Sequence, residues 1–245
     1  MPHITEKTAE RGNPSYVWRA GQERRLTIMR QHVSLEDKRV LDIGCGVGMY
    51  TGAFMRYTSH VFGVEIEHER ACQAHHHTTG VVVSPGERLP FADSVYDVLF
   101  SHEVLEHVDD DRLCANEMVR ITRPGGHIII FVPNRLYFFE THGIYWKSSY
   151  RFGNKPFVNW LPDSIRNRLA PHVRAYTKSS LRGLFDGLPV RELVLTQIFP
   201  GYDNVAARRE WLGRLVKSLS YAVERTPLRI FGLSHLLVLE VVGST

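Results

Sequence analysis

Three glycines at alternate positions, Gly44, Gly46 and Gly48, directly follow a short apolar run at residues 40–43. Asp42 lies inside that run, and Glu65 ends a second apolar run twenty-three positions later. A strand that ends in a glycine turn lets a ligand touch bare backbone. A carboxylate at the tip of the next strand can accept hydrogen bonds from both hydroxyls of a ribose. These residues therefore predict a site for a ligand that contains a nucleoside.

The spacing of the glycines differs from the dinucleotide fingerprint, in which a third glycine opens a helix beneath a pyrophosphate. Here Gly48 comes one position early, and Met49 fills the place of that glycine. Asp42 would repel a pyrophosphate, but it can accept hydrogen bonds from an ammonium group. We therefore expect a ligand with a ribose and a cationic amino-acid end. The alternative is a glycine turn without a ligand, and Asp42 together with Glu65 argues against it.

The elements that must position these residues alternate along the chain. Apolar runs predict strands at 40–43, 61–65, 81–84, 96–101, 127–132, 190–199 and 236–242, and periodic stretches predict helices at 15–32, 48–57, 67–77, 110–122, 178–185 and 205–225. This alternation indicates an α/β fold with a doubly wound parallel sheet. We expect the strands at 81–84 and 127–132 to be buried on both faces, a turn at 123–126, and a central last strand.

The glycine run with Asp42 resembles motif I of class I S-adenosylmethionine-dependent methyltransferases, and Glu65 resembles the acid that closes their ribose site. Residues 87–98, 102–108 and 123–126 are similar to the ubiquinone/menaquinone-biosynthesis type, the methyltransferase type 11 domain. The resemblance covers most of residues 30–133. It implies a Rossmann-like seven-stranded, mostly parallel doubly wound sheet with helices on both faces and one antiparallel strand. It also implies S-adenosyl-L-methionine as cofactor.

The resemblance implies a role for each matching residue at the cofactor. Pro85 stands where the family often has an acid facing the adenine, which leaves the Gly86 backbone or Glu87 for that contact. The residues so assigned are Asp42, Gly44, Cys45 and Gly46 at the methionine end, Glu65 and Ile66 at the ribose and adenine, Gly86 and Glu87 at the adenine amino group, and Ser101 and His102 below the sulfonium.

Acceptor-side candidates follow the strand at 127–132, where open α/β sheets bind ligands. Glu140 and His142 are the predicted catalytic residues, with His142 as general base; the alternative is that they brace a loop. Glu103, Glu106 and His107 resemble a Glu-x-x-Glu-His segment that binds a divalent ion in some quinone O-methyltransferases. A hydrogen-bond network at a helix start is the alternative that we favour over a divalent metal.

Charge is unevenly divided along the chain, because residues 134–245 carry 16 Lys or Arg against 8 Asp or Glu. This excess suggests an anionic or lipid-linked acceptor, or a solvated basic face. Arg135, Arg151, Arg168 and Arg174 are candidates to meet an anion. The basic helix at 205–225 predicts either packing on the core, which we favour, or peripheral contact with a membrane. Residues 75–77, three histidines, are expected to be surface residues rather than metal ligands.

The 245 residues predict a single methyltransferase domain. We expect a helical lid at 1–35, a cofactor-binding core at 36–133, and acceptor-site insertions at 134–176 and 200–230. No apolar run approaches a membrane span, no signal peptide is evident, and the three cysteines form no metal pattern, so a cytoplasmic protein is expected.

The expected function is methyl transfer to a small molecule, with O-methylation of a quinone-like, lipid-linked or glycan substrate as the leading hypothesis. The alternatives are an RNA or protein methyltransferase and a cofactor-binding protein without catalysis. Residues 101–104 lack a base-flipping tetrad, so nucleic acid is not the expected partner.

Overall fold

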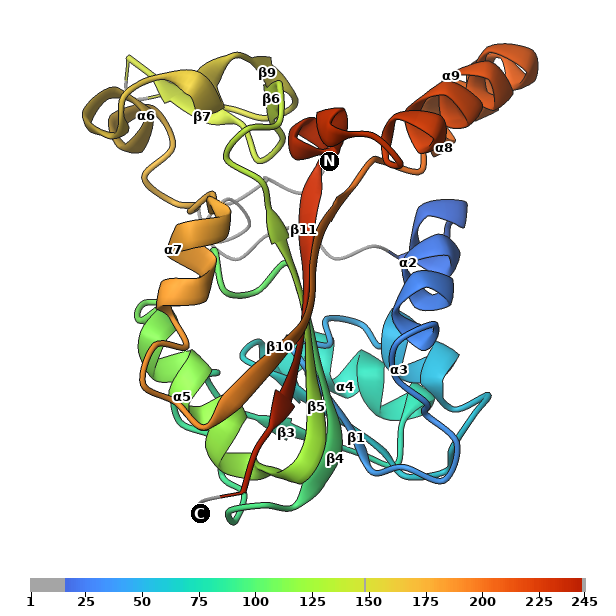
Figure 1. Ribbon diagram of the computed structural model, residues 1–245, viewed down its shortest axis with the longest axis vertical. Helices are drawn as coiled ribbons and strands as arrows, with labels where there is room; N and C mark the ends of the chain where they lie inside the picture. Colours follow the sequence, from blue (N-terminus) through green and yellow to red (C-terminus); the bar gives the residue numbers. More distant parts are fainter. Residues whose placement is uncertain (1–15, 148, 244–245) are drawn as a thin grey trace.

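The computed structural model describes residues 16–147 and 149–243. Seven strands form its central sheet: β1 (Val40–Ile43), β2 (Val61–Glu65), β3 (Gly80–Val83), β4 (Tyr96–His102), β5 (Thr122–Pro133), β10 (Val190–Ile198) and β11 (Ser234–Val241). Their order is β10-β11-β5-β4-β1-β2-β3, and β11 runs antiparallel to both of its neighbours while the other pairs are parallel (Figure 1). The predicted fold class is therefore confirmed, including the central position of the last strand.

Helices cover both faces of this sheet (Figure 1). One face carries α2 (Ala20–Arg30), α3 (Met49–Phe54) and α4 (His68–Ala74), and the other carries α5 (Asp111–Ile121) and α7 (Lys178–Gly183). Side chains that alternate along a strand point to opposite faces. Accordingly, Val98 and Phe100 of β4 pack with the α3 side, whereas Leu99 packs with the α5 side. Burial on both faces explains why these strands are continuous apolar runs.

Two expectations about the sheet are wrong in detail. β3 is an edge strand that pairs with β2 alone among the described strands, and Val83 at its end is 49 % exposed, so apolar composition did not mean burial on both faces. The expected turn at 123–126 is instead a bulge within β5. Thr122 pairs with Tyr96 and His127 pairs with Val98, so the residues between them loop out of the ladder.

The region at 134–176 contains short elements that its weak periodicity did not predict. They are β6 (Phe139–Glu140) paired with β9 (Lys155–Pro156), β7 (Ile144–Trp146) paired with β8 (Ser149–Arg151), the 3-10 helix η2 (Val158–Trp160), and α6 (Asp163–Leu169). A bridge between Asn134 and Tyr176 joins the two ends of this insertion. The insertion lies beyond the carboxyl end of β5 (Figure 1).

A second insertion separates β10 from β11. The helix expected at 205–225 is divided into α8 (Asp203–Arg208) and α9 (Glu210–Val223), followed by the 3-10 helix η3 (Pro227–Phe231). The hairpin of α8 and α9 projects from the same end of the sheet as the first insertion (Figure 1). The helix expected at 15–32 is shorter, because α2 spans Ala20–Arg30 and residues 16–19 before it are not helical; residue 15 lies outside the described part. Among the described helices, none is long and apolar enough to cross a membrane.

Candidate functional site

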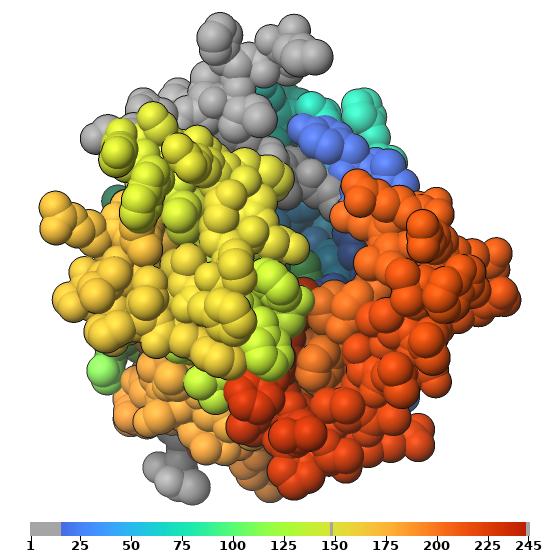
Figure 2. Space-filling model, turned by 90° about the horizontal axis from the view of Figure 1, so that it is seen from above, coloured from blue at the N-terminus to red at the C-terminus, as the bar shows by residue number. Residues whose placement is uncertain are grey.

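A cavity of about 1230 Å³ lies at the carboxyl ends of β1, β2 and β4. Viewed from above, the two insertions border a hollow that leads toward the N-terminal part of the sheet (Figure 2). Of the residues predicted to bind cofactor, the cavity is lined by Asp42, Gly44, Cys45, Gly46, Glu65, Ile66, Gly86, Glu87 and His102. Ser101 is the exception, because it is fully buried in β4 and does not line the cavity.

The backbone conformation of the loop after β1 favours glycine at three positions. Gly44, Gly46 and Gly48 have φ angles of 68°, 56° and 91°, in the left-handed region that favours glycine. A Cβ atom on Gly44 would lie 2.3 Å from Cγ2 of Val104. The backbone N–H of Gly44 donates to the carbonyl of Val64 at 2.8 Å, which ties the loop to the end of β2. Bare backbone therefore faces the cavity here.

Two buried carboxylates lie on either side of this loop. Glu65 is held by the backbone, since its Oε2 accepts from Gly46 N at 2.9 Å and its Oε1 accepts from Glu67 N at 3.0 Å. Asp42 is 2 % exposed, and its Oδ2 has no hydrogen-bond partner within the described residues. Burial, and then the charge of Glu65, raise the pKa of Asp42 well above its usual range. A cationic group in the cavity would give Asp42 the partner that the protein does not supply.

The far end of the cavity contains Gly86 and Glu87. A Cβ atom on Gly86 would lie 2.8 Å from Sγ of Cys114, so the chain passes close to α5 here. Oε1 of Glu87 accepts hydrogen bonds from the backbone N–H groups of Asp109 at 2.7 Å and Asp110 at 3.3 Å. Glu87 therefore anchors the loop before α5, which leaves the Gly86 backbone as the less engaged of the two predicted adenine contacts.

Two further side chains in the cavity wall are kept neutral. Burial lowers the pKa of His102 to about 4, with a contribution from Arg25, and its Nε2 has no hydrogen-bond partner within the described residues. The Tyr50 ring packs against this imidazole at 5.1 Å between centroids. Burial also raises the pKa of Cys45, followed by the charges of Asp42 and Glu65, so the thiol does not ionise into a nucleophile.

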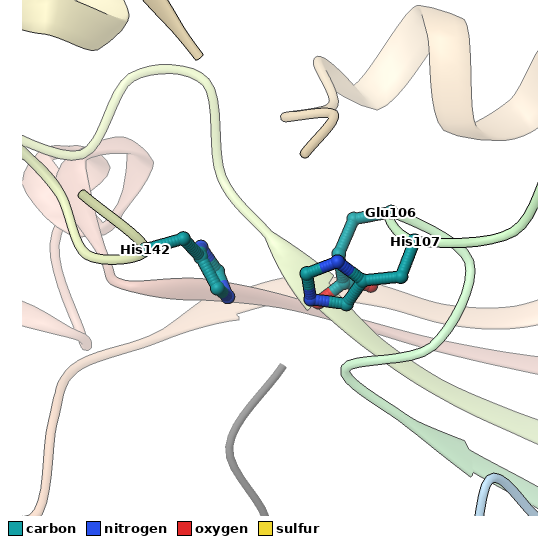
Figure 3. A group of neighbouring side chains, drawn as sticks. All are labelled: Glu106, His107 and His142. Atoms are coloured by element: carbon teal, nitrogen blue, oxygen red, sulfur yellow. The ribbon is translucent and has the colours of Figure 1, made fainter. Parts of the chain in front are cut away.

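Beyond these residues, one ligand atom each of Glu106, His107 and His142 lie within 4.8 Å of one another (Figure 3). Glu106 is 1 % exposed, and its carboxyl group faces that of Glu103. Burial, and then the charge of Glu103, raise the pKa of Glu106 well above its usual range. Burial, and then His142, lower the pKa of His107 to about 4, so its imidazole is neutral. A buried carboxyl group beside a neutral imidazole can exchange its proton for a bound cation.

The second nitrogen of each imidazole is already engaged. Nδ1 of His107 lies 3.3 Å from the carbonyl of His172, and Nδ1 of His142 lies 3.1 Å from Oε1 of Glu140. If both Nδ1 atoms donate in these contacts, each Nε2 keeps a free lone pair. Imidazoles that ligate metals are commonly oriented in this way. The geometry therefore supports a cation site more strongly than the sequence motif alone.

Glu103 lies beside this group rather than in it. Its Oε2 is 3.7 Å from Nε2 of His142, and its Oε1 accepts from Oγ of Ser234 at 3.3 Å. Burial alone would raise the pKa of Glu103, but the larger combined effect of the nearby His102 and His142 lowers it. Of the three predicted metal candidates, the structure brings Glu106 and His107 together and adds His142 in place of Glu103.

Glu140 does not line the cavity, a position that favours the alternative in which it braces a loop. Its Oε2 accepts from Nη2 of Arg166 at 2.8 Å, and both side chains are 2 % exposed. Burial alone would lower the pKa of His142, but Glu140 and Glu103 outweigh it and raise that pKa. Glu140 therefore positions His142 and tunes its charge. Arg166 was not predicted, because no short-range spacing links it to Glu140.

Most of the other basic candidates lie away from the cavity. Among the four arginines predicted to meet an anion, only Arg174 lines it, and its guanidinium donates to the carbonyls of Val108 and Asp109. Arg135 pairs with Asp163 at 2.8 Å, and residues 151 and 168 are exposed. The histidines at 75–77 form the short helix η1 (His75–His77) and are exposed. The predicted surface role of these histidines is thus confirmed.

Comparison with known proteins covers mainly the sheet and the glycine loop. Residues 41–130 match a family model described as a methyltransferase domain. An uncharacterized methyltransferase of Mycolicibacterium gilvum is 37 % identical over 101 residues, which cover 40 % of each chain. A ubiquinone biosynthesis O-methyltransferase of Xylella fastidiosa is 28 % identical over 141 residues, covering 55 % of this chain and 54 % of that one. The chain thus matches about half or less of the length of these relatives.

Similarity of fold extends further than similarity of sequence. The crystal structure of an S-adenosylmethionine-dependent methyltransferase from Mesorhizobium loti superimposes with a TM-score of 0.60 at 14 % identity. That match covers 88 % of this chain and 96 % of the other, so it includes both insertions in part. At such low identity, the match establishes a shared fold and leaves the acceptor to be inferred from the site.

Proposed function

We propose, on the premise that residues 41–130 are a methyltransferase domain of the S-adenosylmethionine-dependent class, that the chain methylates a hydroxyl oxygen of a small molecule. One observation carries this proposal. A continuous cavity connects the glycine loop and Asp42 with the group of Glu106, His107 and His142. The first part suits a cationic nucleoside donor, and the second suits a polar acceptor, so donor and acceptor would meet inside one cavity.

The donor half is supported by charge and by shape. The unpartnered Oδ2 of Asp42 would accept from the ammonium of the methionine end, and Glu65 would accept from the ribose hydroxyls. Gly44 lets Val104 pack directly against the backbone, since a Cβ atom would lie 2.3 Å from Cγ2 of Val104, and the backbone of the loop lines the cavity. These residues bind and orient the donor. The sulfonium needs no further activation, so alignment supplies most of the catalysis.

The acceptor half is proposed to hold a divalent cation at Glu106, His107 and His142. Bound there, such an ion lowers the pKa of a hydroxyl that it contacts. The protein residues around it orient the site: Glu140 fixes the His142 ring through Nδ1, and Arg166 holds Glu140. Methyl transfer forms an oxygen–carbon bond as the sulfur–carbon bond breaks, and the acceptor proton must leave. Glu103, whose carboxylate lines the cavity, is the proposed proton acceptor.

The proposed acceptor is a quinone-like, lipid-linked or glycan hydroxyl compound. The Xylella fastidiosa relative, named as an O-methyltransferase, supports oxygen as the methylated atom. The aromatic side chains of Tyr145 and Phe152, which line the cavity among polar residues, support an acceptor with a flat or apolar part.

Calorimetric titration of the protein with S-adenosylhomocysteine tests the donor half. Binding at micromolar affinity supports it. No binding would refute methyl transfer, and the chain would then share the fold of these enzymes without binding their methyl donor. If the product binds, labelled S-adenosylmethionine incubated with lipid, glycan, protein and RNA extracts sorts the acceptors. Label in RNA or protein would replace the small-molecule acceptor, and label in no fraction would favour the non-catalytic alternative. The Glu65→Ala variant should lose binding, and His76→Ala, an exposed control, should keep it.

A further inference from the structure

The outward face of α9 is apolar and uncovered. Trp211, Leu215 and Leu219 follow one another at intervals of one helical turn and are 60 %, 48 % and 60 % exposed. Gly213 on the opposite side of the helix packs against α8, where a Cβ atom would lie 2.5 Å from Cα of Ala206. The preferred expectation of packing on the core is therefore wrong, because the core clusters include no residue of α9. One side of the helix packs against the protein, and the other side presents large apolar side chains to solvent.

Aromatic side chains of the first insertion are exposed at the same end of the molecule. Trp146, Phe152 and Phe157 are 47 %, 59 % and 56 % exposed. The insertion and the α8–α9 hairpin stand on opposite sides of the hollow in Figure 2. We call these six side chains, with Leu228 and Ile230 of η3, the apolar rim. Large exposed aromatic and aliphatic side chains on both insertions, at one end of the molecule, indicate a binding surface.

Basic residues accompany the apolar rim. Residues 203–231 contain six Lys or Arg against three Asp or Glu. Two of the acidic residues already pair within the hairpin, Glu210 with Arg214 at 3.4 Å and Asp203 with Lys217 at 3.7 Å. Arg208 and Arg209, at the junction of α8 and α9, are exposed. Residues 203–231, which carry five of the eight side chains of the apolar rim, therefore have a net positive charge.

From these two features we propose that the apolar rim docks on the surface of an anionic lipid bilayer. Trp211, Leu215 and Leu219 would enter the boundary between headgroups and acyl chains, while the arginines at 208 and 209 meet anionic headgroups. Tryptophan is favoured at this boundary, because its ring is apolar while its N–H is polar. The positive charge argues against a second copy of this chain as occupant, since two such faces would repel.

Docking in this orientation sets the mouth of the cavity against the bilayer. Since both insertions surround that mouth, a lipid-linked hydroxyl could enter without crossing bulk water (Figure 2). This consequence rests on the proposed function, whereas the docking itself does not. A protein that binds vesicles but transfers no methyl group would refute only the proposed function.

Sedimentation with vesicles tests the docking directly. We expect the wild-type chain to sediment with vesicles of phosphatidylcholine mixed with phosphatidylglycerol, and to do so less as salt is added. The variant Trp211→Ser/Leu215→Ser/Leu219→Ser should partition at least about tenfold less. Arg208→Gln/Arg209→Gln should weaken binding to the mixed vesicles, and it should not change binding to vesicles of phosphatidylcholine without the anionic lipid.

Met55→Ser is the matched control, since this residue is 41 % exposed at the end of α3 and lies outside the apolar rim. It should bind vesicles like the wild type. Circular dichroism and S-adenosylhomocysteine titration verify that each variant is folded. The proposal is overturned if the wild-type chain does not sediment with the mixed vesicles, or if the triple variant binds them as tightly. Concentration-dependent dimerisation that requires the rim, without vesicle binding, would show a second copy to be the occupant.

Discussion

Glu140 and Arg166 form an ion pair of 2.8 Å in which each side chain is 2 % exposed. The pair connects β6 with α6, and a second nitrogen of Arg166 donates to the carbonyl of Val173 at 2.6 Å. The same glutamate accepts a hydrogen bond from the backbone N–H of His142 at 2.9 Å. Packing of the first insertion and orientation of a cavity residue therefore depend on one buried carboxylate.

Arg166→Met should destabilise the protein by about 3–5 kcal/mol, because it leaves Oε2 of the buried, charged Glu140 without its partner. Chemical denaturation measures the loss. Replacing both partners, as in Glu140→Leu/Arg166→Leu, should recover much of it. As a control, Arg182→Met breaks the exposed pair with Glu192 and should cost less than about 1 kcal/mol. An equal loss in both single variants would contradict the importance of burial.

Asp42→Asn should weaken binding of S-adenosylhomocysteine about 10- to 100-fold, because a hydrogen bond between opposite charges becomes a neutral one. Calorimetry measures this change. 5′-Methylthioadenosine, which lacks the amino-acid end, should bind wild type and variant alike. An equal loss for both ligands would place Asp42 elsewhere than at the ammonium.

Without ligand, the same variant should be at least as stable as the wild type at neutral pH. The pKa of Asp42 is higher in the folded than in the unfolded chain, so its contribution to stability is largest at low pH and declines as pH rises through the folded value. Asparagine does not ionise, so the variant lacks that decline in stability. The unfolding temperature of the variant should therefore rise relative to that of the wild type as the pH is raised from acid to neutral. A variant that loses stability throughout would contradict this.

Mn²⁺ or Mg²⁺ should raise the unfolding temperature by several degrees at saturating concentration, because an ion that binds only the folded chain stabilises it. Glu106→Gln should abolish the rise, since it removes the buried carboxylate from the set of three ligands. Ala at exposed residue 76 should leave the rise unchanged. An equal rise of the unfolding temperature in Glu106→Gln and in the wild type would contradict the proposed cation site. His142 would then be the proposed general base.

His235 should make stability fall in acid. It is 2 % exposed, donates to the carbonyl of Tyr176 at 2.8 Å, and accepts from the side-chain amide of Gln197 at 3.0 Å. Burial lowers its pKa from 6.5 to about 4. Between these values the unfolded chain binds a proton that the folded chain does not, so stability present above pH 6.5 is lost as pH falls.

The full loss from this one group is about 3 kcal/mol below pH 4, from the size of the pKa difference. His235→Gln does not titrate, so denaturation curves at several pH values should show a shallower dependence for this variant. Identical slopes would show that His235 contributes no such linkage.

Most of the donor half could be predicted because its residues are local in the chain or adjacent in the sheet. Asp42 and Glu65 end neighbouring parallel strands, and the glycines between them have a spacing that few other structures require. Strand order follows from alternating elements and from the resemblance. The edge position of β3 did not follow, because an apolar strand has the same composition when only one neighbour pairs with it.

The acceptor half depends on contacts between distant segments. His142 joins Glu106 and His107 only because the first insertion folds back over the end of β4. Arg166 of α6 supports His142 indirectly, through its ion pair with Glu140. No local spacing encodes these approaches. The exposure of α9 was equally inaccessible, because an amphipathic pattern predicts a stripe and does not reveal what covers it.

The bridge between Asn134 and Tyr176 brings both ends of the first insertion to a single point on the sheet. A segment closed at its base adds little loop entropy when its length changes. We therefore expect residues 135–175 to be exchangeable for those of a related protein where the contacts of Arg174 with residues 108 and 109 are kept, since the glycine loop lies on other strands. In such a chain, the residues proposed to bind the methyl donor can be retained while those proposed to bind the acceptor change. A graft of this segment would transfer acceptor preference as one unit.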